Sequence, residues 1–135
     1  MALTKVTAAV LEPTAVTDNI SSGSISSDKI ANDAISYAKL ATEFTTAATL
    51  SASDVDFSTA QVFTKTLVAN DTLTFSNVST GMVKDLVITG NFTLTLPASV
   101  KVISGTYDGT VSNLIQIVAT NGSTEQWATI SQEAV

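Results

Sequence analysis

Hydrophobic and polar residues are arranged differently in the two parts of the chain, and the change falls near residue 48. Before it, large aliphatic residues stand singly among Ser, Thr, Asp and Ala. After it, apolar and polar residues alternate in short runs separated by turn residues. Alternation with period two is typical of half-buried strands. The pattern therefore predicts an N-terminal arm over residues 1–48 and a β-domain over residues 49–135.

The start of the arm has the pattern of a short helix. Leu3, Val6, Val10 and Leu11 stand at positions i, i+3, i+7 and i+8, which form one helical face. Pro13 ends this helix, because the residue before a proline is disfavoured in the helical conformation. A helix of about ten residues is marginal in water, so we expect this face to need a partner.

The rest of the arm carries large aliphatic residues at every fifth position: Ile20, Ile25, Ile30, Ile35 and Leu40. Residues 23–31 and 33–41 align as a ten-residue repeat around them. A period of five matches neither an α-helix nor a flat strand. One thin segment cannot bury so many aliphatics, so we predict that several copies wind round a common axis with these residues inside. The alternative is that the arm packs on its own β-domain.

In the second part, alternation and turn residues predict strands at 61–69, 73–75, 82–89, 92–96, 100–103, 114–120 and 126–131. Asn121-Gly122-Ser123 predicts a hairpin between the last two strands. Pro97 is expected at a strand end or edge, since it cannot donate to a ladder. Short strands at this spacing are typical of antiparallel sandwiches and barrels. The predicted fold is mainly β: a short helix, an extended arm and a small antiparallel β-sandwich of jelly-roll type.

Composition narrows the possible functions. The chain has no His, Cys or Arg, and its six Lys face twelve acidic residues for a net charge of −6. It therefore lacks an imidazole base, a thiolate nucleophile and the soft metal ligands. Without Arg and with excess negative charge, nucleic-acid binding is disfavoured as well. We expect a protein that is not an enzyme and uses no cofactor or metal.

Charged residues make only 13% of the chain, whereas 22 Thr and 16 Ser are present. So few charges favour a surface partly covered by another subunit. The N-terminus lacks the long apolar region of a signal peptide, and no run approaches the roughly 18 apolar residues of a membrane span. We therefore expect no membrane insertion and folding in the cytoplasm where the chain is made.

Several segments resemble one family of proteins. Residues 1–7 resemble the opening of many fibre and tailspike proteins of tailed bacteriophages, and the Ile-centred repeats resemble the thin shafts of such fibres. A small β-domain common in phage structural proteins is similar to segments 62–67, 72–78, 94–101, 113–120 and 125–130. The resemblance covers nearly the whole chain, which is shorter than many relatives, with one shaft and one small β-domain. It implies a virion structural protein that is usually trimeric and lacks catalysis in this module.

The resemblance implies a short homotrimeric fibre that assembles in the host cytoplasm and resides in the virion. Its N-terminal face, formed by Leu3, Val6, Val10 and Leu11, would anchor it to other virion proteins of the tail or capsid. The favoured placement is a tail fibre or a fibre-associated adaptor. The alternative is a capsid decoration protein, either a head fibre or a cement protein. A less favoured hypothesis is a carbohydrate-binding module that contacts host surface glycan.

A few residues could carry chemistry or binding. If their segment is extended, Asp54 and Asp56 lie on the same face with their carboxylates about 7 Å apart. Such a pair could serve glycoside hydrolysis or bind Ca²⁺. Connecting loops are equally rich in Asp, so a solvated loop is the favoured interpretation. Trp127 could stack on a sugar, although aromatic residues of sandwiches more often anchor a core or an interface. Exposed roles for Tyr37 and Tyr107 stay open.

Glycosylation is the last possibility that the sequence raises. Five Asn residues begin the motif Asn-x-Ser/Thr, which is the acceptor site for N-glycosylation: Asn19, Asn70, Asn77, Asn91 and Asn121. A chain this rich in Ser and Thr contains such patterns by chance, and we find no signal peptide that would route it to glycosylation. We interpret these five residues as turn and strand-end positions.

Overall fold

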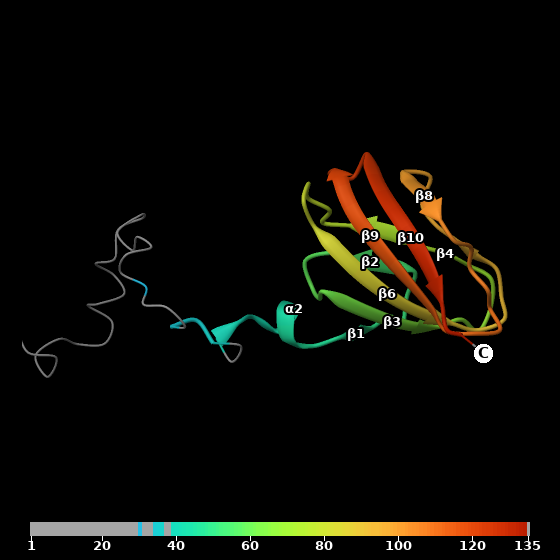
Figure 1. Cartoon of the computed structure of the whole chain (residues 1–135), viewed down its shortest axis with the longest axis horizontal. Helices are drawn as coiled ribbons and strands as arrows, with labels where there is room; N and C mark the ends of the chain where they lie inside the picture. Colours follow the sequence, from blue (N-terminus) through green and yellow to red (C-terminus); the bar gives the residue numbers. More distant parts are fainter. Residues whose placement is uncertain (1–29, 31–33, 37–38, 135) are drawn as a thin grey trace, which may run out of the picture. The chain divides into compact units, whose positions relative to one another are not determined.

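The computed structural model describes residues 30, 34–36 and 39–134. The chain divides into two compact units, Met1–Ala38 and Lys39–Val135. All the helices and strands among the described residues lie in the second unit, which we call the β-unit (Figure 1). The structure is mainly β, as the sequence predicts.

The β-unit contains one short helix and ten strands among its described residues. In chain order they are α2 (Thr42–Thr45), β1 (Ala48–Thr49), β2 (Asp54–Asp56), β3 (Val62–Thr66), β4 (Asp71–Thr72), β5 (Thr74–Ser76), β6 (Val83–Thr89), β7 (Leu94–Thr95), β8 (Val100–Ser104), β9 (Asn113–Asn121) and β10 (Glu125–Gln132). The predicted strands correspond to β3 and β5 to β10, so their positions are confirmed.

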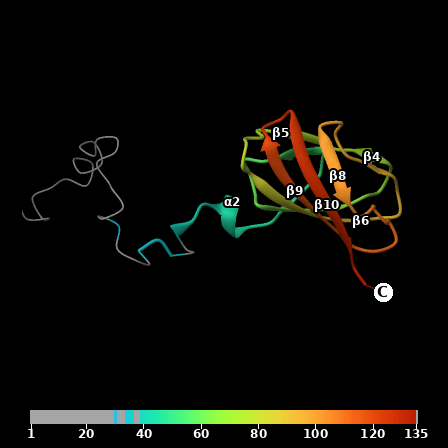
Figure 2. The same ribbon diagram turned by 45° about the horizontal axis from the view of Figure 1, so that its top comes forward.

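The strands form one large sheet and two small ones. The large sheet has the order β1-β3-β6-β9-β10-β8, and β2 pairs with β5 and β4 with β7. In Figure 1, β2 is drawn behind β9 and β10, whereas in Figures 1 and 2 β4 lies to the side of these strands. From β1 the chain passes through β2 to reach β3, parallel to β1, and from β3 it passes through β4 and β5 to reach β6. This arrangement is β-solenoid-like.

A hairpin extends the large sheet beyond β6. Strand β9 pairs antiparallel with β6, and β10 turns back antiparallel to β9. Gly122 in the turn has a φ of 53°, the left-handed region that favours glycine. The hairpin predicted at Asn121-Gly122-Ser123 is therefore confirmed. Strand β8, which precedes this hairpin in the chain, pairs parallel with the other side of β10 and forms the edge of the sheet.

The predicted antiparallel, jelly-roll-type pairing is wrong for most of the unit. Among the described strands, five pairings are parallel and only two are antiparallel. Period-two alternation indicates that one face of each strand is buried. It looks the same whether the neighbouring strand runs parallel or antiparallel. The turn at Gly90-Asn91, for example, is a corner between β6 and β7, which lie in different sheets. Pro97 lies between β7 and β8, outside both strands.

The core fills the space between the sheets. Along β9 the alternation buries Ile115 and Ile117 completely and leaves Leu114 and Val118 on the outer side. The other sheets contribute aromatic packing: the rings of Phe57 and Phe75 lie 5.2 Å apart and tilted. Fully burying one such side chain is worth about 1.5–3 kcal/mol. The shared core is what holds strands that are so short in place.

Helix α2 is held against β6 by a buried charge. Lys84 on β6 is only 1% exposed, and its Nζ lies 3.1 Å from the Glu43 carboxylate and 3.3 Å from the Gln61 side-chain oxygen. The Gln61 N–H also donates to the Glu43 carbonyl at 2.7 Å. Residues before 49 thus contribute directly to the β-unit, and the folding boundary predicted at residue 48 stays a prediction.

Candidate interaction surface

The aliphatic series of the arm is exposed wherever the structure describes it. Ile30 is 41%, Ile35 60% and Leu40 42% exposed. Ile20 and Ile25 lie outside the described residues, as does the predicted anchor: Leu3, Val6, Val10 and Leu11. Three large aliphatics that no described part of the chain covers are consistent with an interchain core, which stays a prediction.

The paired aspartates of β2 hold the solenoid together. They lie on one face, as predicted, because Val55 between them is buried. The Asp54 carboxylate accepts hydrogen bonds from Thr74 at 2.9 Å and Ser76 at 2.6 Å, both on the adjacent strand β5. Hydrogen bonds from Asn77 and Ser58 lower the pKa of Asp56. Within the described ranges, no group of three or more His, Cys, Asp or Glu could hold a metal ion.

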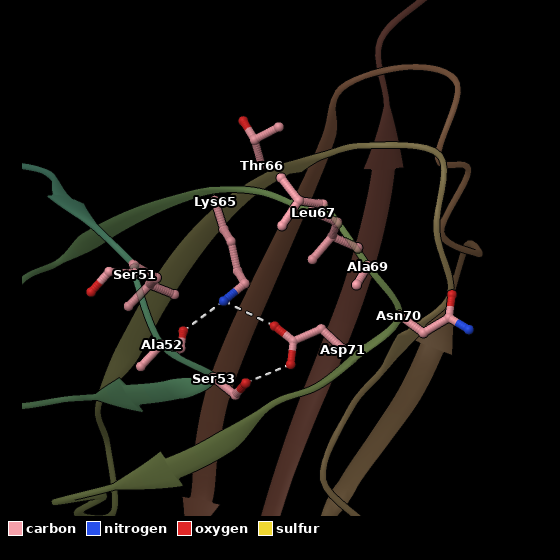
Figure 3. A pocket seen from close by; sticks show the side chains of 11 residues that line it. Ser51, Ala52, Ser53, Lys65, Thr66, Leu67, Ala69, Asn70 and Asp71 are labelled. Atoms are coloured by element: carbon pink, nitrogen blue, oxygen red, sulfur yellow. Dashed lines mark hydrogen bonds and ion pairs between the residues drawn. The ribbon is translucent and has the colours of Figure 1, made fainter.

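A cavity of about 280 Å³ lies between the β1–β2 turn and the segment from the end of β3 into β4 (Figure 3). At its wall the Lys65 Nζ lies 2.9 Å from the Asp71 carboxylate and donates to the Ala52 carbonyl at 2.6 Å. The Ser53 hydroxyl donates to the same carboxylate at 2.5 Å. The side chains of this ion pair are only 10% and 16% exposed, so it is partly shielded from solvent.

The groups in this cavity satisfy one another. Hydrogen bonds from Ser53 and then Lys65 lower the pKa of Asp71, which keeps the carboxylate charged and paired. Ser53 belongs to the first turn of the solenoid, and Lys65 and Asp71 to the next, so the contacts join successive turns. We interpret the cluster as a structural tie, since its charges are already neutralised within the chain.

The outer side of the six-stranded sheet carries an exposed apolar surface. We call it the outer apolar face and define it by Val83, Ile103, Leu114, Val118 and Trp127, which are 37–58% exposed. Val83 lies opposite Val118, and Val118 opposite Trp127, so three apolar side chains form one row across β6, β9 and β10. Beside this row lies a shallow hollow of about 210 Å³.

Trp127 is fixed in place by charges at the side of this face. Its Nε1 donates to the Glu125 carboxylate at 3.0 Å, and Lys101 on β8 forms an ion pair with the same carboxylate. Lys101 and then Trp127 lower the pKa of Glu125. The sequence singled out Trp127 alone. The signal for the whole face was present, because Leu114 and Val118 occupy positions of β9 that alternate with its core residues.

The other singled-out residues have structural positions. Tyr107 donates its hydroxyl to the Gly90 carbonyl at 2.7 Å. Asn70 accepts a hydrogen bond from the Thr93 N–H, and Asn77 has a φ of 53°. Asn121 ends β9, and Asn91 follows the end of β6 in a bend. The positions of these four Asn residues confirm that they are turn and strand-end residues. Asn19 and Tyr37 lie outside the described residues.

The chain was compared with protein-family models, curated proteins and solved structures. No protein-family model, no curated protein and no solved structure matches the chain. Over the residues that the structure covers, no helix is both long and apolar enough to cross a membrane. The features that bear on function are therefore the sequence pattern and the two exposed apolar surfaces, which are the aliphatic series and the outer apolar face.

Proposed function

We propose that the chain is a non-enzymatic structural protein of a phage virion: a short homotrimeric fibre anchored by its N-terminal segment, projecting the β-unit. The observation that carries the proposal is the exposed aliphatic series of the arm. Ile30, Ile35 and Leu40 are 41–60% exposed in the single chain, and the same spacing continues back to Ile20. Regularly placed aliphatics that one chain leaves open are buried economically when identical arms assemble.

The β-unit suits a structural role. Its polar clusters, at Asp54 and at Lys65–Asp71, are used up in joining neighbouring turns of the solenoid. Among the described side chains, no buried nitrogen or oxygen lacks a hydrogen-bond partner. The unit therefore offers a stable body on the end of an arm. The favoured placement is the tail, as a fibre or a fibre-associated adaptor, and the alternative is decoration of the capsid as a head fibre or cement protein.

The trimer is tested by light scattering on the full chain. The mass should be three times the chain mass of 13.9 kDa, or a multiple of that trimer. Ile30→Asp would place three like charges near one axis, so it should lose the threefold assembly. Ser36→Asp is the matched control, because it puts the same charge on an exposed position of the arm outside the aliphatic series. An Ile30→Asp protein of unchanged mass would contradict the proposal.

One observation favours a second candidate, a carbohydrate-binding module. Trp127 is 43% exposed beside a hollow that also contains Gln116, Thr120 and Thr129. An aromatic ring flanked by hydrogen-bonding side chains is the kind of surface on which a sugar stacks. Host surface glycan would then be the ligand, and titration should shift the fluorescence of Trp127 saturably. A chain that binds no glycan in this assay loses the second candidate and keeps the first.

A further inference from the structure

We propose that the side chains of Lys84 and Gln61 become joined by an isopeptide bond, which the folded chain forms by itself with Glu43 as the base. The Lys84 Nζ lies 3.1 Å from the Glu43 carboxylate and 3.3 Å from the side-chain oxygen of Gln61. An amine, an amide carbonyl and a carboxylate in contact are the nucleophile, electrophile and base of an aminolysis. The reaction belongs to the β-unit alone and does not depend on the proposed fibre.

Backbone contacts hold the three groups together. The Gln61 N–H donates to the Glu43 carbonyl at 2.7 Å, and the Asp85 N–H donates to the Gln61 carbonyl at 3.1 Å. The Gln61 side-chain Nε2 donates to the Val83 carbonyl, which leaves its oxygen on the Lys84 side. Because a C=O bond is about 1.23 Å long, the amide carbon lies within about 4.5 Å of the Lys84 Nζ. Well-oriented groups of one molecule react as if present at about 10⁵–10⁸ M, which can drive an otherwise slow amide exchange.

The surroundings of the amine favour the bond. Lys84 is only 1% exposed, so little water surrounds its ammonium. Burying a charge is costly, and the bond replaces this charge with a neutral amide. A hollow of about 340 Å³, which Phe44 and Met82 also line, adjoins the cluster and gives the released ammonia a path to solvent.

The step balances without any further reactant. The Lys84 ammonium passes one proton to the Glu43 carboxylate, and the nitrogen lone pair then forms a bond to the amide carbon of Gln61. The C–N bond to the Gln61 Nε2 breaks, and this nitrogen takes a second proton from the attacking amine and leaves as ammonia. Ammonia finally takes the proton from Glu43 and departs as ammonium. The products are a secondary amide between the two side chains, a free Glu43 carboxylate and one ammonium ion, so the ion pair described above is the starting state.

The other ion pairs of the β-unit lack this combination. Lys65 faces the Asp71 carboxylate, which its contacts keep charged and which is therefore a poor electrophile. Lys101 is 60% exposed and faces the Glu125 carboxylate. Among the described residues, neither of these lysines donates to a side-chain amide. The bond is therefore specific to Lys84, and it would join positions 23 residues apart on neighbouring turns of the solenoid.

The first test is the intact mass of the full chain, measured fresh and after incubation at mildly alkaline pH. Incubation should lower the mass by about 17 Da and release one ammonia per chain. Trypsin, which cuts after lysine, should release fragments 40–65, 66–84 and 85–101 from the denatured fresh chain. After the reaction it cannot cut at Lys84, so 40–65 should appear joined to 66–101. An unchanged mass after incubation overturns the proposal, and so does a lost ammonia that leaves fragment 40–65 unjoined.

Variants test the role of each group. Lys84→Met removes the nucleophile and should give no fragment joined to 40–65. Glu43→Ala keeps the amine and the amide but removes the base, so the bond should form about a hundredfold more slowly. Lys101→Ala is the matched control, because it removes an exposed ion pair and should react at the wild-type rate. Circular dichroism shows which variants are folded. A folded Glu43→Ala protein that reacts as fast as the wild type overturns the assignment of Glu43 as the base.

Discussion

Replacing Glu43 by Gln tests how the segment before β1 contributes to the β-unit. The change keeps the size of the side chain and removes the only carboxylate within ion-pair distance of Lys84 among the described residues. Lys84 is 1% exposed, so its ammonium has little water to replace the lost partner. Removing one partner of a buried ion pair leaves an uncompensated charge and typically costs about 3–5 kcal/mol.

The structure places the expected loss below that range. The Glu43 side chain is 26% exposed, so water already screens part of the interaction. The Gln61 side-chain oxygen, 3.3 Å from the Lys84 Nζ, remains as an acceptor. We therefore expect Glu43→Gln to lower the free energy of unfolding by about 2–3 kcal/mol. At about 4 °C per kcal/mol for a unit of this size, the melting temperature should fall by about 8–12 °C.

Urea unfolding at pH 7, followed by circular dichroism, measures the loss. Lys101→Ala is the control, because it removes an ion pair whose lysine is 60% exposed and should cost under about 1 kcal/mol. Adding Lys84→Met to Glu43→Gln should recover most of the stability, since the uncompensated charge disappears. A Glu43→Gln protein within about 0.5 kcal/mol of the wild type would refute the reasoning, because a buried, unpaired ammonium cannot be that inexpensive.

Three further changes probe the β-unit. Contacts from a serine hydroxyl and a lysine ammonium lower the pKa of Asp71, so the stability that its carboxylate contributes is lost as pH falls below about 4. In urea unfolding, Asp71→Asn should be less stable than the wild type at pH 7 and approach the wild type at pH 3. Burial, and next the neighbouring Asp108 carboxylate, raise the pKa of Tyr107, so the wild type loses stability as pH rises above about 10. Tyr107→Phe removes the hydrogen bond to Gly90 and should be about 1 kcal/mol less stable than the wild type at pH 7, with a smaller difference above pH 10. Gly105 has a φ of 79°, and an added Cβ would meet a β10 carbonyl, so Gly105→Ala should cost about 1–3 kcal/mol, and more than Gly81→Ala, where the space is open.

The positions of the strands could be predicted from the sequence, but the directions of their pairing could not. Alternation along β9 separates Ile115 from Leu114 whether its neighbour is parallel or antiparallel. Direction depends on where each turn leads, and most turns here are corners between sheets. Asn121-Gly122-Ser123 was predictable because a short loop with glycine at a left-handed position specifies a hairpin by itself.

Long-range contacts were the other feature that the sequence could not provide. Glu43 and Lys84 are separated by 41 positions, and no local pattern joins them. The same is true of Lys101 and Glu125, which are separated by 24 positions. By contrast, the regular spacing of Ile30, Ile35 and Leu40 predicts aliphatics that one thin segment cannot bury, and the three side chains are 41–60% exposed.

A density map of the whole virus particle, in which the chain is located, tests whether it forms a short trimeric fibre of the virion. We expect threefold density in which three copies share a thin shaft and each ends in a β-unit, attached to the tail or the capsid through the N-terminal segment. Density at the tail would select the fibre or adaptor, and density on the head would select capsid decoration. Particles that lack the chain, or that hold it as isolated single copies, would rule out the trimeric virion fibre.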